Sequence, residues 1–463
     1  MDSKKTTKNI LISCTVIVVV ACLCLGALAL TGVGVSMLWP LRVSENETPI
    51  PSTVTETVGT PEEAEGDFPP ALLEAVEQIE AQVSELRGLE PNETFDRELI
   101  SEAELEEIVA EDFFADYTDE DARQDVVVLS TLGLLSPDFN LKKLYTDLYS
   151  EQIAGFYDDE VQTMYVVQGT GFGGSEKLTY AHEFTHVLQD QVWGLEDGLG
   201  MNEDACEADS ERCAAVQALV EGDASTLEIL WFQNYATRQD YEDLMRTFDE
   251  YESPVLDSAP PYIASDLYFP YEKGQAFVQE LYDDGGFDRV DEAFENLPVS
   301  TEQILHPERY PEDRPIPVFL PDLTDTLGAG WSLYDQNVMG EWYTYLILNQ
   351  AYDEDLRLSE SFASTAAEGW GGDAYAFYLN EDTDDVVFML DSTWDSSDDA
   401  IEFSDAFHSY ADARWTMDEE SVGDVFVWRG EEGSVAFILD GSRTVWVMAP
   451  EASLAEAVMN TLR

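Results

Sequence analysis

Positively charged residues are scarce in this chain of 463 residues. Lys and Arg number 22 against 96 Asp and Glu, so the formal net charge is −74. This balance excludes a nucleic-acid-binding role, because binding to phosphates requires Lys and Arg to displace counterions. It favours an acidic, solvated shell whose self-repulsion is relieved by salt. Ca²⁺ bound on acidic loops is the alternative explanation of the charge.

Cysteine is also scarce, and its five copies fall in two places. Three lie in the apolar N-terminal segment, whereas Cys206 and Cys213 lie in the part that we expect to be exported. A close pair in an oxidising compartment predicts a disulfide. On one continuous helix this spacing would separate the two residues by about 10 Å, too far for a bridge. We therefore expect Cys206 in a loop and Cys213 in the first turn of the next helix.

An uncharged apolar run extends from Ile10 to Leu38. It is longer than the roughly 20 residues that a helix needs to cross a bilayer. Three lysines precede it and Arg42 alone follows it closely, which favours an N-terminus inside and the bulk of the chain outside. The sequence therefore predicts a cytoplasmic tail at 1–9, a single transmembrane anchor at 10–38 and an extracytoplasmic remainder. A signal-peptidase site at 27–29 or a lipobox at 19–22 would remove the anchor, but the apolar run continues past both.

The remainder divides into three by composition. Residues 39–67 are rich in Thr, Pro and Glu and predict a disordered stalk. Residues 68–378 read mainly as helices, with a β-hairpin at about 152–167. Residues 379–463 read as a small α+β unit with a hairpin turn at 440–441. The expected fold class is α+β and predominantly helical.

The segment His182-Glu183-Phe184-Thr185-His186 fits the pattern H-E-x-x-H, in a chain with only four histidines. On a helix, expected at about 175–192, positions i and i+4 face the same way, so both imidazoles can bind one Zn²⁺. Glu183 can then act as a general base on a water molecule at the ion. The sequence therefore predicts a zinc site here in preference to a chance match.

A catalytic zinc site needs a third protein ligand and one position left for water. Glu221 is the candidate, because it lies on a second expected helix (209–235) among apolar and small residues, where a carboxylate needs a cation. Asp223 is the competing carboxylate, with a supporting or solvent-facing role as its alternative. Ala218, Gly222 and Ala224 are expected to let this helix approach the helix of the histidines.

With two His and one Glu as ligands, the chain resembles gluzincin-type HExxH zinc metallopeptidases. More narrowly, it is similar to a group of poorly characterised, membrane-attached bacterial metallopeptidases. The resemblance implies a zincin-like domain that hydrolyses peptide bonds at the outer face of the membrane. The matching segments are Glu151–Asp158, His182–Gln191, Ala218–Ala224, Phe269–Gly274 and Ser300–Pro307.

The resemblance also implies a strand at the edge of a sheet that binds an extended peptide, here at about Thr163–Val167. One position departs from the family pattern. Gluzincins often carry a carboxylate four residues after the Glu ligand, which orients a His, and this chain has Ser225 there. Asp190 and Asp223 are the candidates for that orienting role.

Peptide hydrolysis also needs a group that stabilises the oxyanion. Related enzymes use a Tyr or a His, and the candidates here are Tyr271 and His306, with core packing and a structural role as the respective alternatives. The rival interpretation is a non-enzymatic, surface-anchored binding or assembly protein with a structural or vestigial zinc site. A fully coordinated ion would favour that rival. Hydrolysis of a non-peptide amide, such as cell-wall material, is a third possibility.

Overall fold

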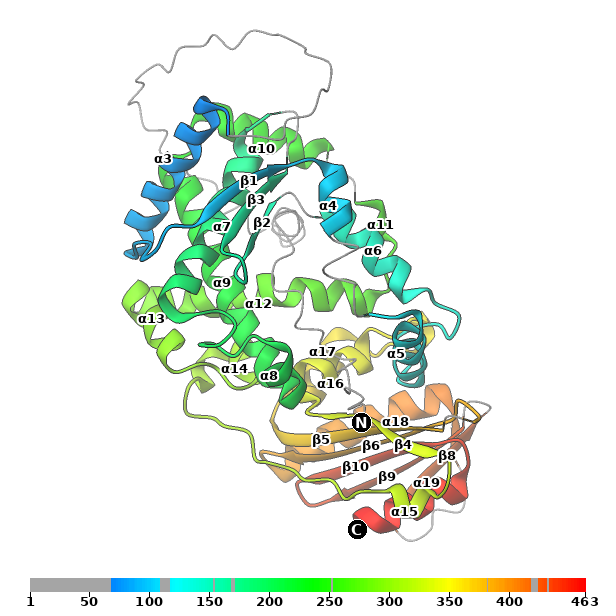
Figure 1. The fold of residues 1–463 in the computed structure, drawn as a ribbon. Helices are drawn as coiled ribbons and strands as arrows, with labels where there is room; N and C mark the ends of the chain where they lie inside the picture. The colour runs from blue at the N-terminus through cyan, green and yellow to red at the C-terminus, as the bar shows by residue number, and fades with distance from the viewer. Residues whose placement is uncertain are drawn as a thin grey trace, which may run out of the picture.

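The chain folds into an α+β structure in which a helical part is followed by a part built on a large sheet (Figure 1). The expected fold class is confirmed at this level. Within the described part of the chain, no helix is both long and apolar enough to cross a bilayer. The predicted tail, anchor and stalk, residues 1–67, lie outside it. The computed structural model describes residues 68–108, 117–152, 155–167, 171–250, 253–380, 382–417, 424–430 and 433–463.

The two parts have the following elements. The helical part comprises α3 (Pro70–Arg87), β1 (Asp96–Ile100), α4 (Glu102–Ile108), α5 (Asp119–Thr131), α6 (Leu141–Gln152), β2 (Gly155–Asp158), β3 (Thr163–Val167), α7 (Gly174–Trp193), α8 (Glu203–Ala208), α9 (Ser210–Tyr235), α10 (Arg238–Glu250), α11 (Pro254–Asp257), α12 (Pro261–Gly285), α13 (Phe287–Glu295), α14 (Thr301–Leu305) and the 3-10 helix η2 (Pro307–Arg309). The sheet part comprises α15 (Thr324–Leu327), β4 (Trp331–Asn337), α16 (Gly340–Asn349), the 3-10 helix η3 (Glu354–Leu356), α17 (Glu360–Ala367), β5 (Trp370–Asn380), β6 (Val386–Trp394), α18 (Ser397–Arg414), β7 (Thr416–Met417), β8 (Phe426–Gly430), β9 (Gly433–Asp440), β10 (Arg443–Ala449) and α19 (Ala452–Leu462).

The small sheet of the helical part has the strand order β1-β3-β2. The hairpin of β2 and β3 is confirmed, and the two strands pair antiparallel. β1 pairs parallel with β3 on its other side, so Thr163–Val167 is the central strand and the prediction that it lies at an edge is wrong. The strand β1 begins with Asp96, Arg97 and Glu98, and three successive charges hide its β-character in the sequence. The edges of this sheet are β1 and β2.

The two helices expected to carry the metal ligands are confirmed as α7 and α9. The first begins one residue before Ser175, and its N-cap is Gly173, whose backbone N–H donates to Glu176 Oε2 at 2.9 Å. The next residue, Gly174, has no space for a side chain, since a Cβ there would lie 1.9 Å from the carbonyl oxygen of Asp240. This close contact with α10 fixes the start of α7.

The disulfide between Cys206 and Cys213 is confirmed, with 5.2 Å between the two Cα atoms. Cys213 lies in the first turn of α9, as expected. Cys206 lies in the short helix α8, so its expected placement in a loop is wrong. The bridge forms because the chain breaks between the two helices at Asp209, which has an extended φ of −155°.

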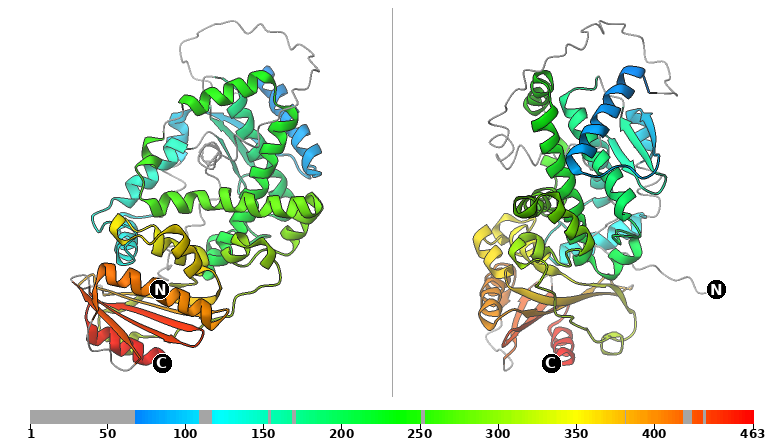
Figure 2. Two further views of the ribbon diagram at one scale, coloured as in Figure 1. Left: turned by 180° about the vertical axis from the view of Figure 1, so that it is seen from behind. Right: turned by 90° about the vertical axis from the view of Figure 1, so that its left-hand side faces the viewer.

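The large sheet has the strand order β4-β5-β6-β10-β9-β8-β7, with antiparallel pairing between neighbours. The predicted hairpin at 440–441 is confirmed, because Asp440 of β9 pairs with Arg443 of β10. Both faces of the sheet are covered, one by α18 and the other by α19 (Figure 2). The sheet begins with β4 and β5, and the expected boundary at residue 379 falls inside β5.

Candidate metal centre

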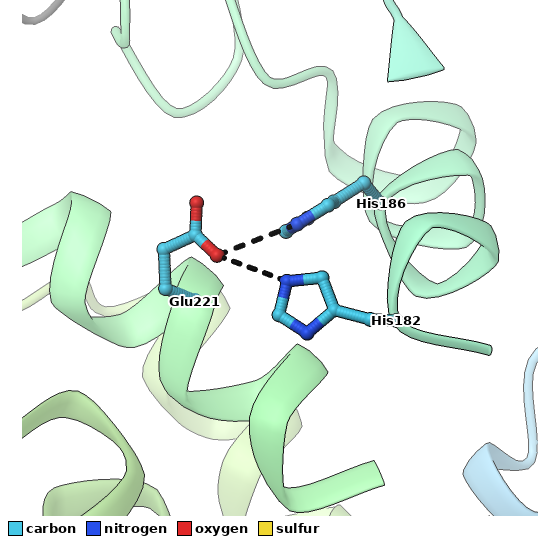
Figure 3. A group of neighbouring side chains, drawn as sticks. All are labelled: His182, His186 and Glu221. Atoms are coloured by element: carbon cyan, nitrogen blue, oxygen red, sulfur yellow. Dashed lines mark hydrogen bonds and ion pairs between the residues drawn. The ribbon is translucent and has the colours of Figure 1, made fainter. Parts of the chain in front are cut away.

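Three buried side chains from α7 and α9 converge on one point (Figure 3). Glu221 Oε2 lies 3.1 Å from His182 Nε2 and 3.5 Å from His186 Nε2. A tetrahedral zinc ion with ligand bonds of about 2.0–2.1 Å separates its ligand atoms by roughly 3.3 Å. The two observed distances bracket this value. The residue types and the spacing therefore fit zinc.

The electrostatics of the three groups also indicate a cation site. Burial by itself raises the pKa of Glu221, but the two neighbouring imidazoles outweigh it and lower that pKa to about 2. Burial by itself lowers the pKa of His186, and the Glu221 carboxylate reverses this and raises it. Positive charge beside the buried carboxylate of Glu221 therefore favours its ionised form. A divalent ion would supply that charge without protonating the ligands.

His182 is oriented by a carboxylate that was not predicted. Glu228 Oε2 lies 3.2 Å from Nδ1 of this ring, and it is buried on α9. A proton held on Nδ1 leaves the lone pair of Nε2 for a metal. Glu228 follows Glu221 by two helical turns, so the spacing i, i+7 was the available signal. The family pattern points instead to the position of Ser225.

His186 is oriented through an amide. Its Nδ1 lies 2.8 Å from Gln189 Oε1, and Gln189 Nε2 donates to Val220 O at 3.0 Å and to Asp223 Oδ2 at 2.9 Å. Asp223 therefore supports the site through Gln189 and is not one of the three converging groups. Asp190, the other predicted orienting residue, accepts from the hydroxyl of Tyr157 at 2.8 Å instead.

Glu183 is buried beside the two histidines and faces β2. Its Oε2 accepts a hydrogen bond of 3.2 Å from the backbone N–H of Tyr157. Burial raises the pKa of Glu183, and the imidazoles of His186 and His182 partly oppose this. A cavity of about 240 Å³ reaches this carboxylate between α3, β3 and α7, and apolar side chains such as Leu72 and Val166 line much of it.

The two candidate oxyanion stabilisers occupy different places. Tyr271 is buried on α12, and its ring centroid lies 6.2 Å from that of His182. His306 lies between α14 and η2, and its Nε2 is 2.9 Å from Glu341 Oε1 of α16. Hydrogen bonding to Glu341 raises the pKa of His306. Of the two residues, we therefore find only Tyr271 packed against a predicted metal ligand.

The small residues of α9 serve a contact other than the expected one. A Cβ on Gly222 would lie 2.2 Å from the carbonyl oxygen of Gly274 in α12. A Cβ on Gly274 would in turn lie 2.0 Å from the carbonyl oxygen of Ala218. Gly222 and Ala218 therefore bring α9 against α12, the helix that carries Tyr271, and for these two residues the prediction of a contact with the histidine helix is wrong.

A second group of potential ligands comprises Glu302, Asp313 and Asp395. The guanidinium of Arg309 lies among them. Its Nη1 contacts Glu302 and lies 3.2 Å from Asp395 Oδ2 and 3.9 Å from Asp313 Oδ2. This group, called the Arg309 cluster below, thus has a cation of its own.

Comparison with known proteins reaches only the sheet part of the chain. Residues 332–459 match a family described as a domain of unknown function, DUF8575. The match begins at β4 and ends in α19, so it covers the seven-stranded sheet and leaves α7 and α9 outside. No curated protein and no solved structure is similar enough to the chain to count as a match.

Proposed function

We propose that this protein is a zinc-dependent peptidase whose metal is held by His182, His186 and Glu221. The observation that carries the proposal is the convergence of these three buried groups, in which Glu221 lies from each imidazole at a distance close to that expected between two ligands of tetrahedral zinc. Within the described residues, no fourth His, Cys, Asp or Glu joins them. Three protein ligands with one position left open are typical of catalytic zinc. A structural site, the rival interpretation, usually closes all four positions.

The arrangement around the three ligands is zincin-like in this proposal. A sheet packs on the helix that carries the histidines, and the Glu ligand comes from the next long helix. The edge strand available to an extended peptide is β2, not β3. The apolar cavity beside Glu183 offers space for a side chain of the substrate next to the bond that is cut.

The chemistry divides between the ion and the chain. A bound zinc ion would polarise the carbonyl of the substrate and acidify a water molecule. Glu183 takes a proton from the attacking water and delivers it to the leaving amine, and the Tyr157 N–H holds its carboxylate in place. Its raised pKa suits a group that must both accept and release a proton. Tyr271 is the candidate donor to the oxyanion, because its ring packs near His182.

We also infer the location of the site from the N-terminal sequence. The apolar run at 10–38 would anchor the chain in the cell membrane with the site outside. The disulfide between Cys206 and Cys213 supports an oxidising compartment. Peptides or proteins outside the membrane are then the expected substrates.

Replacement of Glu183 by Gln tests this function. The variant keeps the size of the side chain but loses the base, so we expect zinc to be retained and peptide hydrolysis to fall by a factor between about a hundred and ten thousand. Hydrolysis is measured on a peptide library and zinc by elemental analysis, with Glu280→Gln on α12 as the matched control. Retained activity in Glu183→Gln would exclude this mechanism.

A further inference from the structure

The side chain of Arg87 connects the first described helix to a predicted metal ligand. Arg87 is the last residue of α3, and its side chain is fully buried. Its Nε donates to both carboxylate oxygens of Asp223 on α9, at 3.0 and 3.1 Å. In a chain with so few cations, burial of a guanidinium at this point requires an explanation.

The contacts continue from Asp223 to the metal centre. Asp223 accepts from Gln189 Nε2, whose other hydrogen goes to the carbonyl oxygen of Val220. Both hydrogens of the amide are therefore engaged, and only Oε1 is left to face His186 Nδ1, 2.8 Å away. An acceptor at that position requires the proton of the ring on Nδ1 and leaves Nε2 free to bind a metal.

We propose that Arg87 is a positioning residue for the metal ligand His186, acting through Asp223 and Gln189. This inference rests on the proposed zinc site and adds a condition to it. Without Arg87, the buried carboxylate of Asp223 loses the cation that pairs with it within the described part of the chain, and with it a fixed orientation. Gln189 can then rotate its amide and present N–H to the ring, which stabilises the tautomer that cannot bind metal through Nε2. Zinc affinity thus depends on the packing of α3 against α9, which places Arg87 beside Asp223.

Two aromatic rings and a second carboxylate also contact the guanidinium of Arg87. Its guanidinium carbon lies 4.6 Å from the ring centroid of Phe287 and 5.5 Å from that of Trp193, at cation–π distance. Nη1 lies 2.7 Å from Asp291 Oδ1 on α13. These contacts fix the guanidinium from α7 and α13, so its contact with Asp223 is one of several that orient it.

Zinc affinity of the full-length protein, measured by competition with a chromogenic chelator, tests the proposal. In Arg87→Met we expect the zinc dissociation constant to rise about tenfold, as is typical for groups that orient a ligand. The visible spectrum of the Co²⁺-loaded variant should also change, because a reoriented His186 alters the ligand field at the metal. Arg87→Lys keeps the charge but loses the Nε–H, and we expect an intermediate dissociation constant. If Arg87→Met does not fold, Arg87→Lys carries the test alone.

A matched control exists on the same pair of helices. Trp231 of α9 donates to Gln82 Oε1 of α3 at 2.9 Å, a bond between the same two helices that involves neither a histidine nor Gln189 or Asp223. Gln82→Leu should leave the zinc dissociation constant unchanged. A wild-type constant in Arg87→Met or Arg87→Lys, or an equal loss in Gln82→Leu, would overturn the proposal.

The outcome also separates this inference from the proposed function. A wild-type protein that binds zinc but cuts no peptide would contradict the peptidase, while the dependence on Arg87 would still be measured. Zinc bound equally well with and without Arg87 contradicts the positioning role alone. A wild-type protein that binds no zinc contradicts both.

Discussion

Two groups of three potential metal ligands lie in the described chain, and they differ in what neutralises them. In the group of α7 and α9, two imidazoles face the Glu221 carboxylate, and among the described residues no Lys or Arg forms an ion pair with it. In the Arg309 cluster, a guanidinium lies among Glu302, Asp313 and Asp395. A cluster of carboxylates alone therefore does not identify a metal site. What distinguishes the first group is that its buried carboxylate faces two imidazoles, which can serve as neutral metal ligands, and not a permanently charged guanidinium.

The largest expected difference between the groups is in zinc binding. Glu221→Gln removes a charged ligand, so we expect zinc affinity to fall by about a hundredfold or more, beyond the effect of losing an orienting group. Glu302→Gln should leave zinc affinity unchanged. Chelator competition on the two variants measures both. Equal losses in the two variants would mean that the Arg309 cluster also holds the metal.

The Arg309 cluster should show the opposite pattern, with an effect on stability. Burial already raises the pKa of Glu302 to about 8, although Arg309 opposes this. Above that pH, Arg309→Met leaves a buried carboxylate without its cation, which we expect to lower the free energy of unfolding by about 3 kcal/mol. Urea unfolding measures this change, and zinc affinity should stay at its wild-type value. The double variant Arg309→Met/Glu302→Gln removes the unpaired charge and should recover most of the stability. No recovery would show that the cluster stabilises by packing instead of charge.

A smaller effect is expected for the carboxylate that orients His182. Glu228→Gln keeps a side chain of similar size but weakens the hold on Nδ1, so zinc affinity should fall roughly tenfold. The same chelator competition measures it, with Glu242→Gln on the exposed face of α10 as control. If Glu228→Gln binds zinc like the wild type, the orienting role belongs to another group.

The smallest expected effect concerns pH. Zinc binding at α7 and the stability contributed near the Arg309 cluster should depend on pH in opposite directions. Acid competes with zinc for the imidazoles of α7, so zinc binding should weaken as the pH falls. The His306–Glu341 pair beside the Arg309 cluster should respond oppositely. Its hydrogen bond raises the folded-state pKa of His306 above the unfolded value of about 6.5. The stability it contributes is therefore complete below that pH and is lost as the pH rises through the folded pKa.

Thermal unfolding of the zinc-free protein between pH 6 and 9 measures this pair. We expect the melting temperature of the wild type to fall with rising pH by more than that of His306→Gln. Parallel curves for the two proteins would show that the pair does not titrate as expected.

The sequence was most informative where a local pattern repeats along one helix. The spacing of His182 and His186 predicted a shared face of α7, and a carboxylate amid small apolar residues predicted Glu221 on α9. The orienting role of Glu228 was not predicted, because almost the whole length of α9 is buried. In a helix without a polar face, polar and apolar residues do not alternate with the helical period. The sequence therefore does not indicate which buried side chain points toward a given neighbour.

The sheets were harder to predict for a different reason. The strands β4 and β5 pair with each other across an intervening stretch that contains α16 and α17. The strand β5 carries Gly371, Gly372 and Asp373 near its start, residues that weaken a strand pattern. In β1, the successive charged residues also weaken the strand pattern. Pairing between distant segments compensates for such weak local preference, and it is not visible in one segment alone.

The sequence by itself determined the residues that can bind a metal, because the spacing of side chains on a helix follows from its period. It also indicated the disulfide and the hairpins, whose partners are close along the chain. Only the tertiary structure decided which carboxylate lies beside a guanidinium and which one faces two imidazoles. It also connected Arg87 to His186 through Asp223 and Gln189. The physical reason is that the charge state of a buried group depends on neighbours from other elements, which only packing brings within hydrogen-bond distance.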